Sequence, residues 1–268
     1  METPLQSHYR QHRYAVLPQI LQAGEIDCLR AALLRHFATS GRPVGLGLHQ
    51  PNAAVAIPEL AWLYAHPGIL AALRDLSGGR QPVFTGNSDA HKDMLSWWHK
   101  DTSEGSGGCF RGDWTAWPDC SVIRVGVYLQ DHPTRDGLSV RLGSQHHRAL
   151  DQGAVRHVST SRGDIVLFDV RLTHAGQFAD GLEAPLLKAA GRSWLTKPAT
   201  RLRTAYSHLR RRVEKLSIFF TYGSDAADTQ EYCDFELAAR HRRASPAGPL
   251  PDALLEALLR ENVAVPRG

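Results

Sequence analysis

The hydrophobic pattern of residues 1–80 is mainly helical. Apolar residues recur at three- and four-residue intervals over 20–34 and again over 57–76, which predicts two helices. A short apolar run at 14–18 predicts a strand before the first helix. The stretch 40–56 is rich in Gly, Pro and Asn, so we expect a loop there.

Beyond residue 82 the pattern changes to short apolar runs separated by turn residues, which is typical of a sandwich or barrel. The predicted strands are 82–86, 93–99, 121–130, 137–141, 155–159, 164–170 and 215–222. We therefore predict a mainly β, α+β protein. Its core is expected to be a double-stranded β-helix of the jelly-roll or cupin-like type, flanked by N-terminal helices.

The chain is expected to form a single domain over 1–268, with its core at about 8–223. An Ala-, Leu-, Lys- and Arg-rich stretch, 178–212, interrupts the strand series and is expected to be a helical or irregular insert. The polar tail 224–268 is expected to be partly helical. One small apolar face of the tail is formed by Leu254, Leu255, Leu258 and Leu259.

The charge of the chain is mildly positive, with a formal net charge of +4 at pH 7. Part of the excess lies in two arginine-rich stretches, 201–215 and 240–243. No aromatic-interleaved basic motif accompanies them, so we expect no nucleic-acid partner. An anionic small-molecule substrate suits a positive rim better.

Cysteine usage and the start of the chain bear on the compartment. The four cysteines are widely spaced without a CxxC pair, which argues against a disulfide scaffold. The N-terminus lacks the features of a signal peptide, and no apolar run is long enough to span a bilayer. We therefore expect a cytoplasmic protein with no membrane partner.

Two histidines and one aspartate stand in a pattern that indicates a metal site. In an extended strand residues two apart face the same side, so His99 and Asp101 can reach one ion while Lys100 faces away. His174 ends the apolar run 163–174 and can supply a third ligand from a different strand. Two imidazoles and one carboxylate on one face of Fe(II) leave positions open for a co-substrate and O₂. The implied chemistry is oxygen activation.

A second His-x-Asp pair, His91 and Asp93, has the same spacing. We favour His99 and Asp101, because 94–98 looks like a strand that would deliver them to the mouth of a barrel. The residues before His91, 86–90, look like a turn, which would position a ligand poorly. A histidine or aspartate beside a strand is by itself weak evidence for a metal site. The evidence is stronger here because the His-x-Asp pair occurs together with a later strand that ends in His174.

With these motifs, the chain resembles the phytanoyl-CoA dioxygenase-like group of Fe(II)/2-oxoglutarate-dependent oxygenases. The resemblance covers about 8–223, and the motifs occur in the family's order. They are the N-terminal strand and helix, the His-x-Asp segment at 98–101, the strand and turn at 127–131 and 137–140, the Gly-Ser-x-His sequence at 143–146 and the distal histidine strand at 163–174.

The resemblance implies a double-stranded β-helix with Fe(II) bound by His99, Asp101 and His174. It further implies that 2-oxoglutarate and O₂ are consumed while an unactivated C–H bond of a small molecule is hydroxylated or oxidatively cyclised. A secondary-metabolite intermediate, such as a sugar, an amino acid or a carrier-bound compound, is the expected substrate.

The far carboxylate of 2-oxoglutarate needs a cationic partner, which relatives usually supply from an Arg-x-Ser pair on a late strand. Here Lys215 and Ser217 have that spacing, and Arg212 just before the strand is the competing anchor. Lysine is a departure from the family pattern, since it offers a point charge in place of a bidentate fork.

The insert after His174 is a second departure from the pattern of the family. Its basic residues either line a substrate entrance or belong to a solvated cap; they are Lys188, Arg192, Lys197, Arg201 and Arg203. Four tryptophans either wall the pocket or belong to the core; they are Trp97, Trp98, Trp114 and Trp117.

Two other functions stay open at this point. One is a cupin-like binding protein with a vestigial or zinc-occupied site. The other is an iron enzyme that uses no keto acid.

Overall fold

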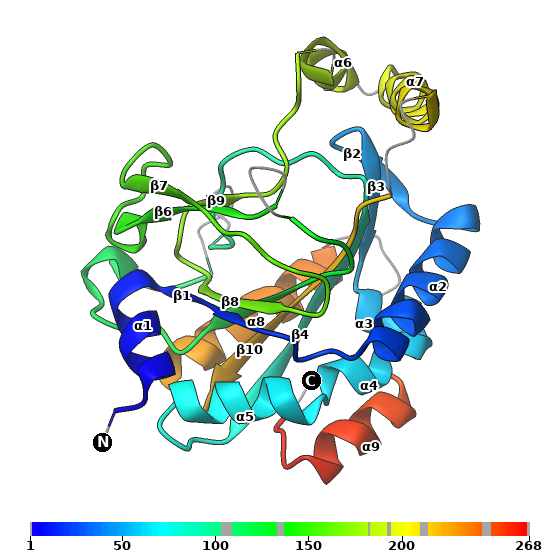
Figure 1. Cartoon of the computed structure of the whole chain (residues 1–268). Coiled ribbons are helices and arrows are strands. Elements are labelled where there is room, and N and C mark those ends of the chain that lie inside the picture. The colour runs from blue at the N-terminus through cyan, green and yellow to red at the C-terminus, as the bar shows by residue number, and fades with distance from the viewer. Residues whose placement is uncertain are drawn as a thin grey trace.

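The architecture consists of two antiparallel sheets that face each other, with helices on the outside of the larger one (Figure 1). It is taken from a computed structural model, which describes residues 2–102, 109–132, 137–181, 183–191, 194–209, 214–242 and 248–266. The seven-stranded sheet has the order β1-β8-β5-β10-β4-β3-β2, and the three-stranded sheet has the order β7-β6-β9. The strands are β1 (Tyr14–Leu17), β2 (Arg42–Val44), β3 (Gly47–Pro51), β4 (Pro82–Lys92), β5 (Ile123–Tyr128), β6 (Ser139–Leu142), β7 (Ala154–His157), β8 (Ile165–Asp169), β9 (His174–Ala175) and β10 (Leu216–Ser224).

The α-helices fall into an N-terminal group, a pair between β9 and β10, and a C-terminal pair. They are α1 (Pro4–His12), α2 (Ala23–Thr39), α3 (Ala53–Ala56), α4 (Ala61–Tyr64), α5 (Pro67–Leu76), α6 (Glu183–Ala190), α7 (Thr196–Leu209), α8 (Ala227–Arg242) and α9 (Asp252–Arg260). Short 3₁₀ turns occur at Pro58–Leu60, Trp114–Ala116 and Ser144–His146. Helices α4, α5 and α9 lie together below the large sheet, and α6 and α7 lie at the opposite end of the molecule (Figure 1).

Alternation along the strands separates the core from the space between the sheets. On β5, Val125 and Val127 belong to the core that the large sheet shares with the helices, whereas Arg124 and Tyr128 face the other way, into a pocket between the sheets. The same alternation holds on β10, where Ile218 and Phe220 join the core and Ser217 and Phe219 line the pocket. The two-residue period of the strands thus builds an apolar face and a polar interior at once.

Most predicted strands are confirmed. The predictions for 14–18, 121–130, 137–141, 155–159, 164–170 and 215–222 coincide with β1, β5, β6, β7, β8 and β10. The two sheets and the N-terminal helices confirm the predicted double-stranded β-helix. The expected helix over 57–76 is present, but it is broken into a 3₁₀ turn, α4 and α5.

The predicted loop 40–56 was wrong, because this stretch contains β2, β3 and α3. Both strands lie at the edge of the large sheet, where β3 pairs with β4 and β2 pairs with β3. Edge strands tolerate proline, since one side of the strand needs no partner. Pro43 therefore fits in the edge strand β2, and Pro51 fits as the last residue of β3, beyond the part that pairs with β2.

The assignments on either side of residue 92 were also wrong. β4 continues through the expected turn 86–90, and the expected strand 93–99 is irregular. Two polar residues in β4 have partners far away in the chain: the buried Ser88 Oγ accepts a hydrogen bond from the Ala54 amide, and the half-buried Asp89 forms an ion pair with Arg124. A strand with several polar residues is easily taken for a turn, because the sequence does not show the distant partners of those residues.

The insert and the tail are both helical where the structure describes them. Helices α6 and α7 confirm the expected helical character of 178–212. In the tail, Leu254 and Leu258 are buried in the core, but Leu259 is 77% exposed, so its expected place on the same apolar face was wrong. Within the described residues, none of the helices combines the length and the apolar character that crossing a bilayer requires.

Substitutions in α9 test whether the tail is part of the fold. We expect Leu258→Ala to lower the free energy of unfolding by about 2–5 kcal/mol, because it leaves a cavity in the core. The neighbouring Leu259→Ala should change it by less than about 0.5 kcal/mol, because that side chain is exposed. Urea unfolding of both variants measures the difference, and equally small effects would show that α9 does not pack on the core.

Candidate functional site

His99 and His174 lie side by side on two segments that are far apart in the sequence. The His99 amide donates to the His174 carbonyl, and the His174 amide donates to the His99 carbonyl, both at 2.9 Å. The Asp101 amide donates to the Val170 carbonyl at 3.2 Å. The irregular segment 94–101 is therefore held along β9 and the turn before it.

The side chains of His99, Asp101 and His174 converge on one point. Their candidate ligand atoms all lie within 4.8 Å of one another, and in the part of the chain that the structure describes they form the one such group of three. Asp101 Oδ1 lies 3.9 Å from His99 Nε2, and Asp101 Oδ2 lies 3.7 Å from His174 Nε2. Neighbouring ligand atoms on an ion with bonds of about 2.1 Å are roughly 3 Å apart, so small side-chain rotations would bring all three to bonding distance.

Backbone carbonyls orient both imidazole rings. His99 Nδ1 lies 2.7 Å from the Trp97 carbonyl oxygen, and His174 Nδ1 lies 3.0 Å from the Leu172 carbonyl oxygen. Because a carbonyl oxygen only accepts, each Nδ1 carries the proton and donates it. Each Nε2 therefore keeps a lone pair that points into the cluster, which is the usual arrangement of a metal-binding histidine.

The electrostatics keep the cluster ready for a cation. Burial and, to a smaller extent, the neighbouring His99 lower the pKa of His174 to about 4, so the ring is neutral at pH 7. Burial alone would raise the pKa of Asp101, but His174, Arg124 and His99 outweigh it and the net shift is downward. The site thus combines an ionised carboxylate with neutral imidazole.

One buried polar atom suits a metal ion directly. Asp101 Oδ2 is buried without a hydrogen-bond partner among the described residues. A buried charged oxygen without a partner is costly, and a divalent cation would satisfy it. Two imidazole nitrogens and one carboxylate oxygen are a donor set that suits Fe(II) and other first-row metals.

Lys100, between the two ligands, faces away from the cluster as predicted. Its side chain is buried, and Nζ donates to the carbonyl oxygens of Ser144 and Arg171, both at 2.8 Å. Ser144 Oγ accepts in turn from the Thr173 amide at 2.8 Å. Lys100 and the Gly-Ser motif therefore tie the His99 segment to the turn that delivers His174.

Arg124 is a site residue that the sequence analysis missed. Its Nε lies 3.6 Å from Asp101 Oδ2, and its Nη2 donates to Asp89 at 2.6 Å. Burial lowers the pKa of Arg124, but Asp101 and Asp89 outweigh burial and raise the pKa above its usual value. An arginine inside the apolar run 122–129 is the signal that could have revealed it, because an arginine is almost never fully buried unless it is paired.

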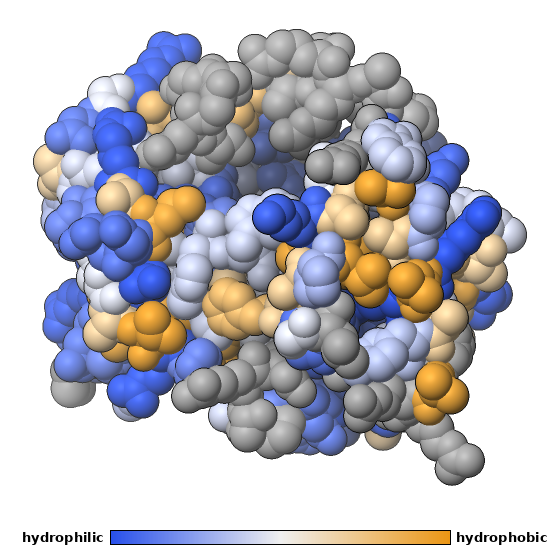
Figure 2. Space-filling model, turned by 90° about the horizontal axis from the view of Figure 1, so that it is seen from above, coloured by the Kyte–Doolittle hydropathy of each residue, from blue (hydrophilic) through white to orange (hydrophobic). Residues whose placement is uncertain are grey.

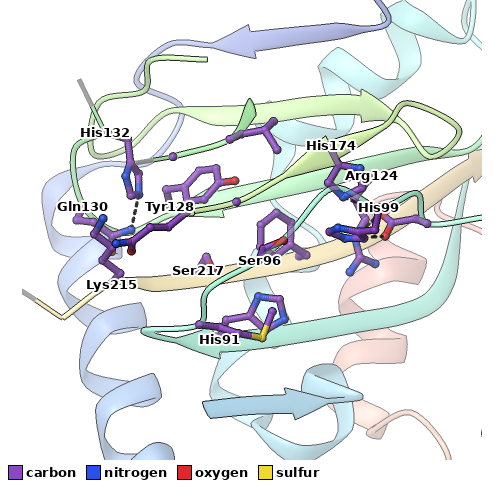
Figure 3. Close-up of a pocket in the computed structure, with 17 residues that line it drawn as sticks. His91, Ser96, His99, Arg124, Tyr128, Gln130, His132, His174, Lys215 and Ser217 are labelled. Carbon is purple, nitrogen blue, oxygen red and sulfur yellow. Dashed lines mark hydrogen bonds and ion pairs between the residues drawn. The ribbon is translucent and has the colours of Figure 1, made fainter. Parts of the chain in front are cut away.

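The cluster lies at one end of a pocket of about 100 Å³ between the two sheets, called here the site pocket. Figure 3 shows His99, His174 and Arg124 at one end and Lys215, Gln130 and His132 at the other. The site pocket is lined by His91, Met94, Ser96, His99, Asp101, Arg124, Tyr128, Gln130, His132, Gly137, Leu138, His174, Gly176, Gln177, Lys215, Ser217 and Phe219.

Two of the three residues predicted to bind the co-substrate lie in the described part of the chain, and the third does not. Lys215 and Ser217 both line the site pocket, at the start of β10. Arg212, the alternative anchor, lies outside the described residues. The roles of all three stay predictions.

His99 and Asp101, which were favoured over His91 and Asp93, lie together with His174, but the reason for favouring them was wrong. His91 lies on regular strand β4, whereas 94–98 is irregular. His91 lines the site pocket without joining the cluster, and burial lowers its pKa to about 3. Asp93 points elsewhere, since its Oδ1 accepts from the Lys215 amide at 2.9 Å.

The tryptophans do not line the site pocket where the structure describes it. Trp97 is 59% exposed, and Trp114 is buried in a separate apolar cluster with Trp117 packed against it. The Trp98 ring contacts the Phe178 ring at an interplanar angle of 53°, with ring centroids 5.5 Å apart.

The basic residues of the insert are also mostly away from any cavity. Lys188, Lys197 and Arg201 are exposed, and Arg192 lies outside the described residues. Arg203 is buried and paired with Glu183 at 2.8 Å.

Comparison with solved structures identifies the same fold in bacterial enzymes. No family model matches the chain, and no curated protein is significantly similar to it in sequence. The chain is similar to the non-heme alpha ketoglutarate dependent carbocyclase SnoK from nogalamycin biosynthesis, with a TM-score of 0.58, 17% identity and 95% coverage of each chain. It is also similar to HygX from Streptomyces hygroscopicus with nickel, 2-oxoglutarate and hygromycin B bound, with a TM-score of 0.57, 18% identity, and coverage of 83% of this chain and 88% of that one.

A third similar structure is AviO1 from Streptomyces viridochromogenes Tue57, with a TM-score of 0.55, 18% identity, and coverage of 85% of this chain and 96% of that one. At these identities the likeness establishes the fold. The chain therefore has the double-stranded β-helix of non-haem 2-oxoglutarate-dependent enzymes.

Replacing Lys100 tests its role in positioning the cluster. We expect Lys100→Met to weaken Co(II) binding by about 10–100-fold, as the loss of a group that orients metal ligands usually does. Lys100→Arg should restore part of the affinity, and the exposed Lys188→Met should have no effect. Titration of the metal-free protein measures this. A lower melting temperature with unchanged Co(II) affinity would mean that Lys100 serves stability alone.

Proposed function

We propose that the protein is an Fe(II)/2-oxoglutarate-dependent oxygenase that acts on a small molecule. The observation that carries the proposal is the convergence of His99, Asp101 and His174 at one end of a pocket whose other end holds Lys215. The fold, shared with non-heme alpha ketoglutarate dependent enzymes, supports the same conclusion.

In this proposal, His99, Asp101 and His174 hold the iron from one side and leave its other positions to 2-oxoglutarate and O₂. When bound, the metal and its co-substrate supply the oxidant for an unactivated C–H bond, with succinate and CO₂ as by-products. Because Asp101 keeps its carboxylate, no ligand position opens for a halide. We therefore propose hydroxylation or oxidative ring formation in preference to halogenation.

Lys215 is the proposed anchor for the far carboxylate of 2-oxoglutarate, with Ser217 beside it. Ser217 on β10 pairs with Tyr128 on β5, and Lys215 immediately precedes β10. The Tyr128 hydroxyl is buried without a hydrogen-bond partner among the described residues, so it can donate to a carboxylate in the pocket. Arg212 stays the alternative anchor.

The similar structures support a substrate from secondary metabolism. SnoK is a carbocyclase and SnoN an epimerase of nogalamycin biosynthesis, and HygX is known with hygromycin B bound. We propose a natural-product intermediate of comparable kind as the substrate. An anionic group on it would suit the net charge of +4.

Removal of the carboxylate tests the proposed function. We expect Asp101→Ala to lower 2-oxoglutarate-dependent succinate formation by about 100-fold or more, because one metal ligand is lost. The matched control is Asp113→Ala, which removes an exposed carboxylate. Succinate release in the presence of Fe(II), ascorbate and candidate substrates is the readout. Unchanged release in Asp101→Ala, or none from the wild type with any substrate, would contradict the proposal.

The anchor is tested by equilibrium binding. We expect Lys215→Met to raise the Kd for 2-oxoglutarate by about 10–100-fold, the loss typical of one charge-assisted hydrogen bond. Metal affinity should not change, because Lys215 lies at the far end of the pocket. The control is Lys188→Met, which removes an exposed lysine that lines neither the site pocket nor the cavity behind it. If Lys215→Met binds 2-oxoglutarate normally, the anchor is another residue, with Arg212→Met as the next variant.

A further inference from the structure

A second, larger cavity of about 620 Å³ lies behind the Lys215 end of the site pocket. We call it the rear cavity. On one side it is lined by Arg203, Thr204 and Ser207 of α7, and on the other by the segments at the end of β4, after β5 and before β10. Figure 2 looks onto this end of the molecule and shows a hollow with hydrophilic side chains inside it.

The two cavities share a wall. Gln130, Gln177 and Lys215 line both of them. Gln130 is fixed, because its Oε1 accepts from the Leu216 amide and its Nε2 lies 2.7 Å from His132 Nε2. Gln177 Oε1, in contrast, is buried without a hydrogen-bond partner among the described residues. The wall therefore has a fixed part, Gln130, and a part, Gln177, whose side-chain oxygen has no hydrogen-bond partner among the described residues.

We propose that 2-oxoglutarate enters the site pocket from the rear cavity, past Gln177, while the substrate reaches the metal from the side of His99. This inference rests on the proposed function and adds separate routes for the co-substrate and the substrate.

The orientation of the co-substrate favours this route. The keto-acid end must reach the metal cluster, and the far carboxylate must stop at Lys215. A molecule that enters from the rear cavity arrives with its keto-acid end first and its far carboxylate last. It therefore does not have to turn round inside the site pocket, which is the smaller of the two cavities.

The charges along the rear cavity are nearly balanced. Its cationic side chains are Arg30, Lys92, Arg162, Arg203 and Lys215, and its acidic side chains are Asp93, Asp131, Asp180 and Glu214. Oxygens of Asp93, Asp131 and Asp180 accept backbone amides, which offsets part of their negative charge. A dicarboxylate can therefore pass without strong repulsion.

The outer wall of the rear cavity is a fixed helix. Arg203 Nε donates to Glu183 Oε1 at 2.8 Å, Nη1 donates to the Leu46 carbonyl at 3.3 Å, and Nη1 also contacts the Asp93 carbonyl. These bonds join α7 to α6 and to the core. Arg203 thus has a structural role, because its bonds fix the position of α7 as one wall of the rear cavity.

The metal cluster is accessible from its other side. The His99 side chain is 42% exposed, whereas the His174 side chain is 7% exposed. A substrate can therefore reach the cluster beside His99 without passing the rear cavity.

Binding kinetics of 2-oxoglutarate test the route. The anaerobic Fe(II)-loaded protein is mixed with 2-oxoglutarate in a stopped-flow instrument, and the absorbance of the metal–ligand complex is followed. In Ser207→Trp the rear cavity is narrowed, so we expect association and dissociation to slow by the same factor, about tenfold, with an unchanged Kd. The two rates change together because a route is passed in both directions. Gln177→Ala should speed both rates.

The control is Ala205→Trp, which adds the same ring to an exposed position of α7 outside the cavity. Circular dichroism tests whether each variant is folded. If Ser207→Trp does not fold, the rates of Gln177→Ala decide whether 2-oxoglutarate uses this route. Rates equal to the control in folded Ser207→Trp, or a changed Kd, would overturn the route and leave the proposed function intact. A wild-type protein that does not bind 2-oxoglutarate would overturn the proposed function itself.

Discussion

The site depends on two backbone hydrogen bonds between His99 and His174. Each residue donates its amide to the carbonyl of the other at 2.9 Å, outside any regular strand pair. This exchange sets the distance between two segments that the sequence separates widely. Because the backbone positions are fixed, the two imidazoles need only their Nδ1 contacts to carbonyl oxygens to turn Nε2 towards Asp101. Metal binding would then need little ordering of the protein.

Buried charges hold both sides of this junction. Lys100 bonds to the carbonyls of Ser144 and Arg171, and Arg171 itself forms a fully buried ion pair with Asp169 at 2.7 Å. Arg171 also donates to the carbonyls of Trp114 and Trp117, so each nitrogen of its guanidinium group has a hydrogen-bond partner. Buried ion pairs add little net stability, but breaking one is costly. Here they favour one arrangement of the turn.

The sequence was sufficient to predict that His99, Asp101 and His174 converge and to predict most strands, because both follow from local patterns. The His99, Asp101 and His174 convergence followed from spacing and strand order, although 94–98 is irregular. The sequence was insufficient where the interaction partner of a residue lies far away in the chain. Arg124 and Asp89 lie on different strands and meet only after folding, so the first was overlooked and the second was assigned to a turn. For the same reason, Pro43 and Pro51 indicated a loop, although Pro43 lies in the edge strand β2 and Pro51 ends β3.

X-ray absorption at the iron edge, on the Fe(II)-loaded protein and on His174→Ala, measures the ligands of the metal directly. We predict two imidazole nitrogens and one carboxylate in the wild type, and the loss of one imidazole in the variant. Identical spectra from the two proteins, or iron surrounded by water oxygens alone, would contradict the claim that these three side chains hold one ion.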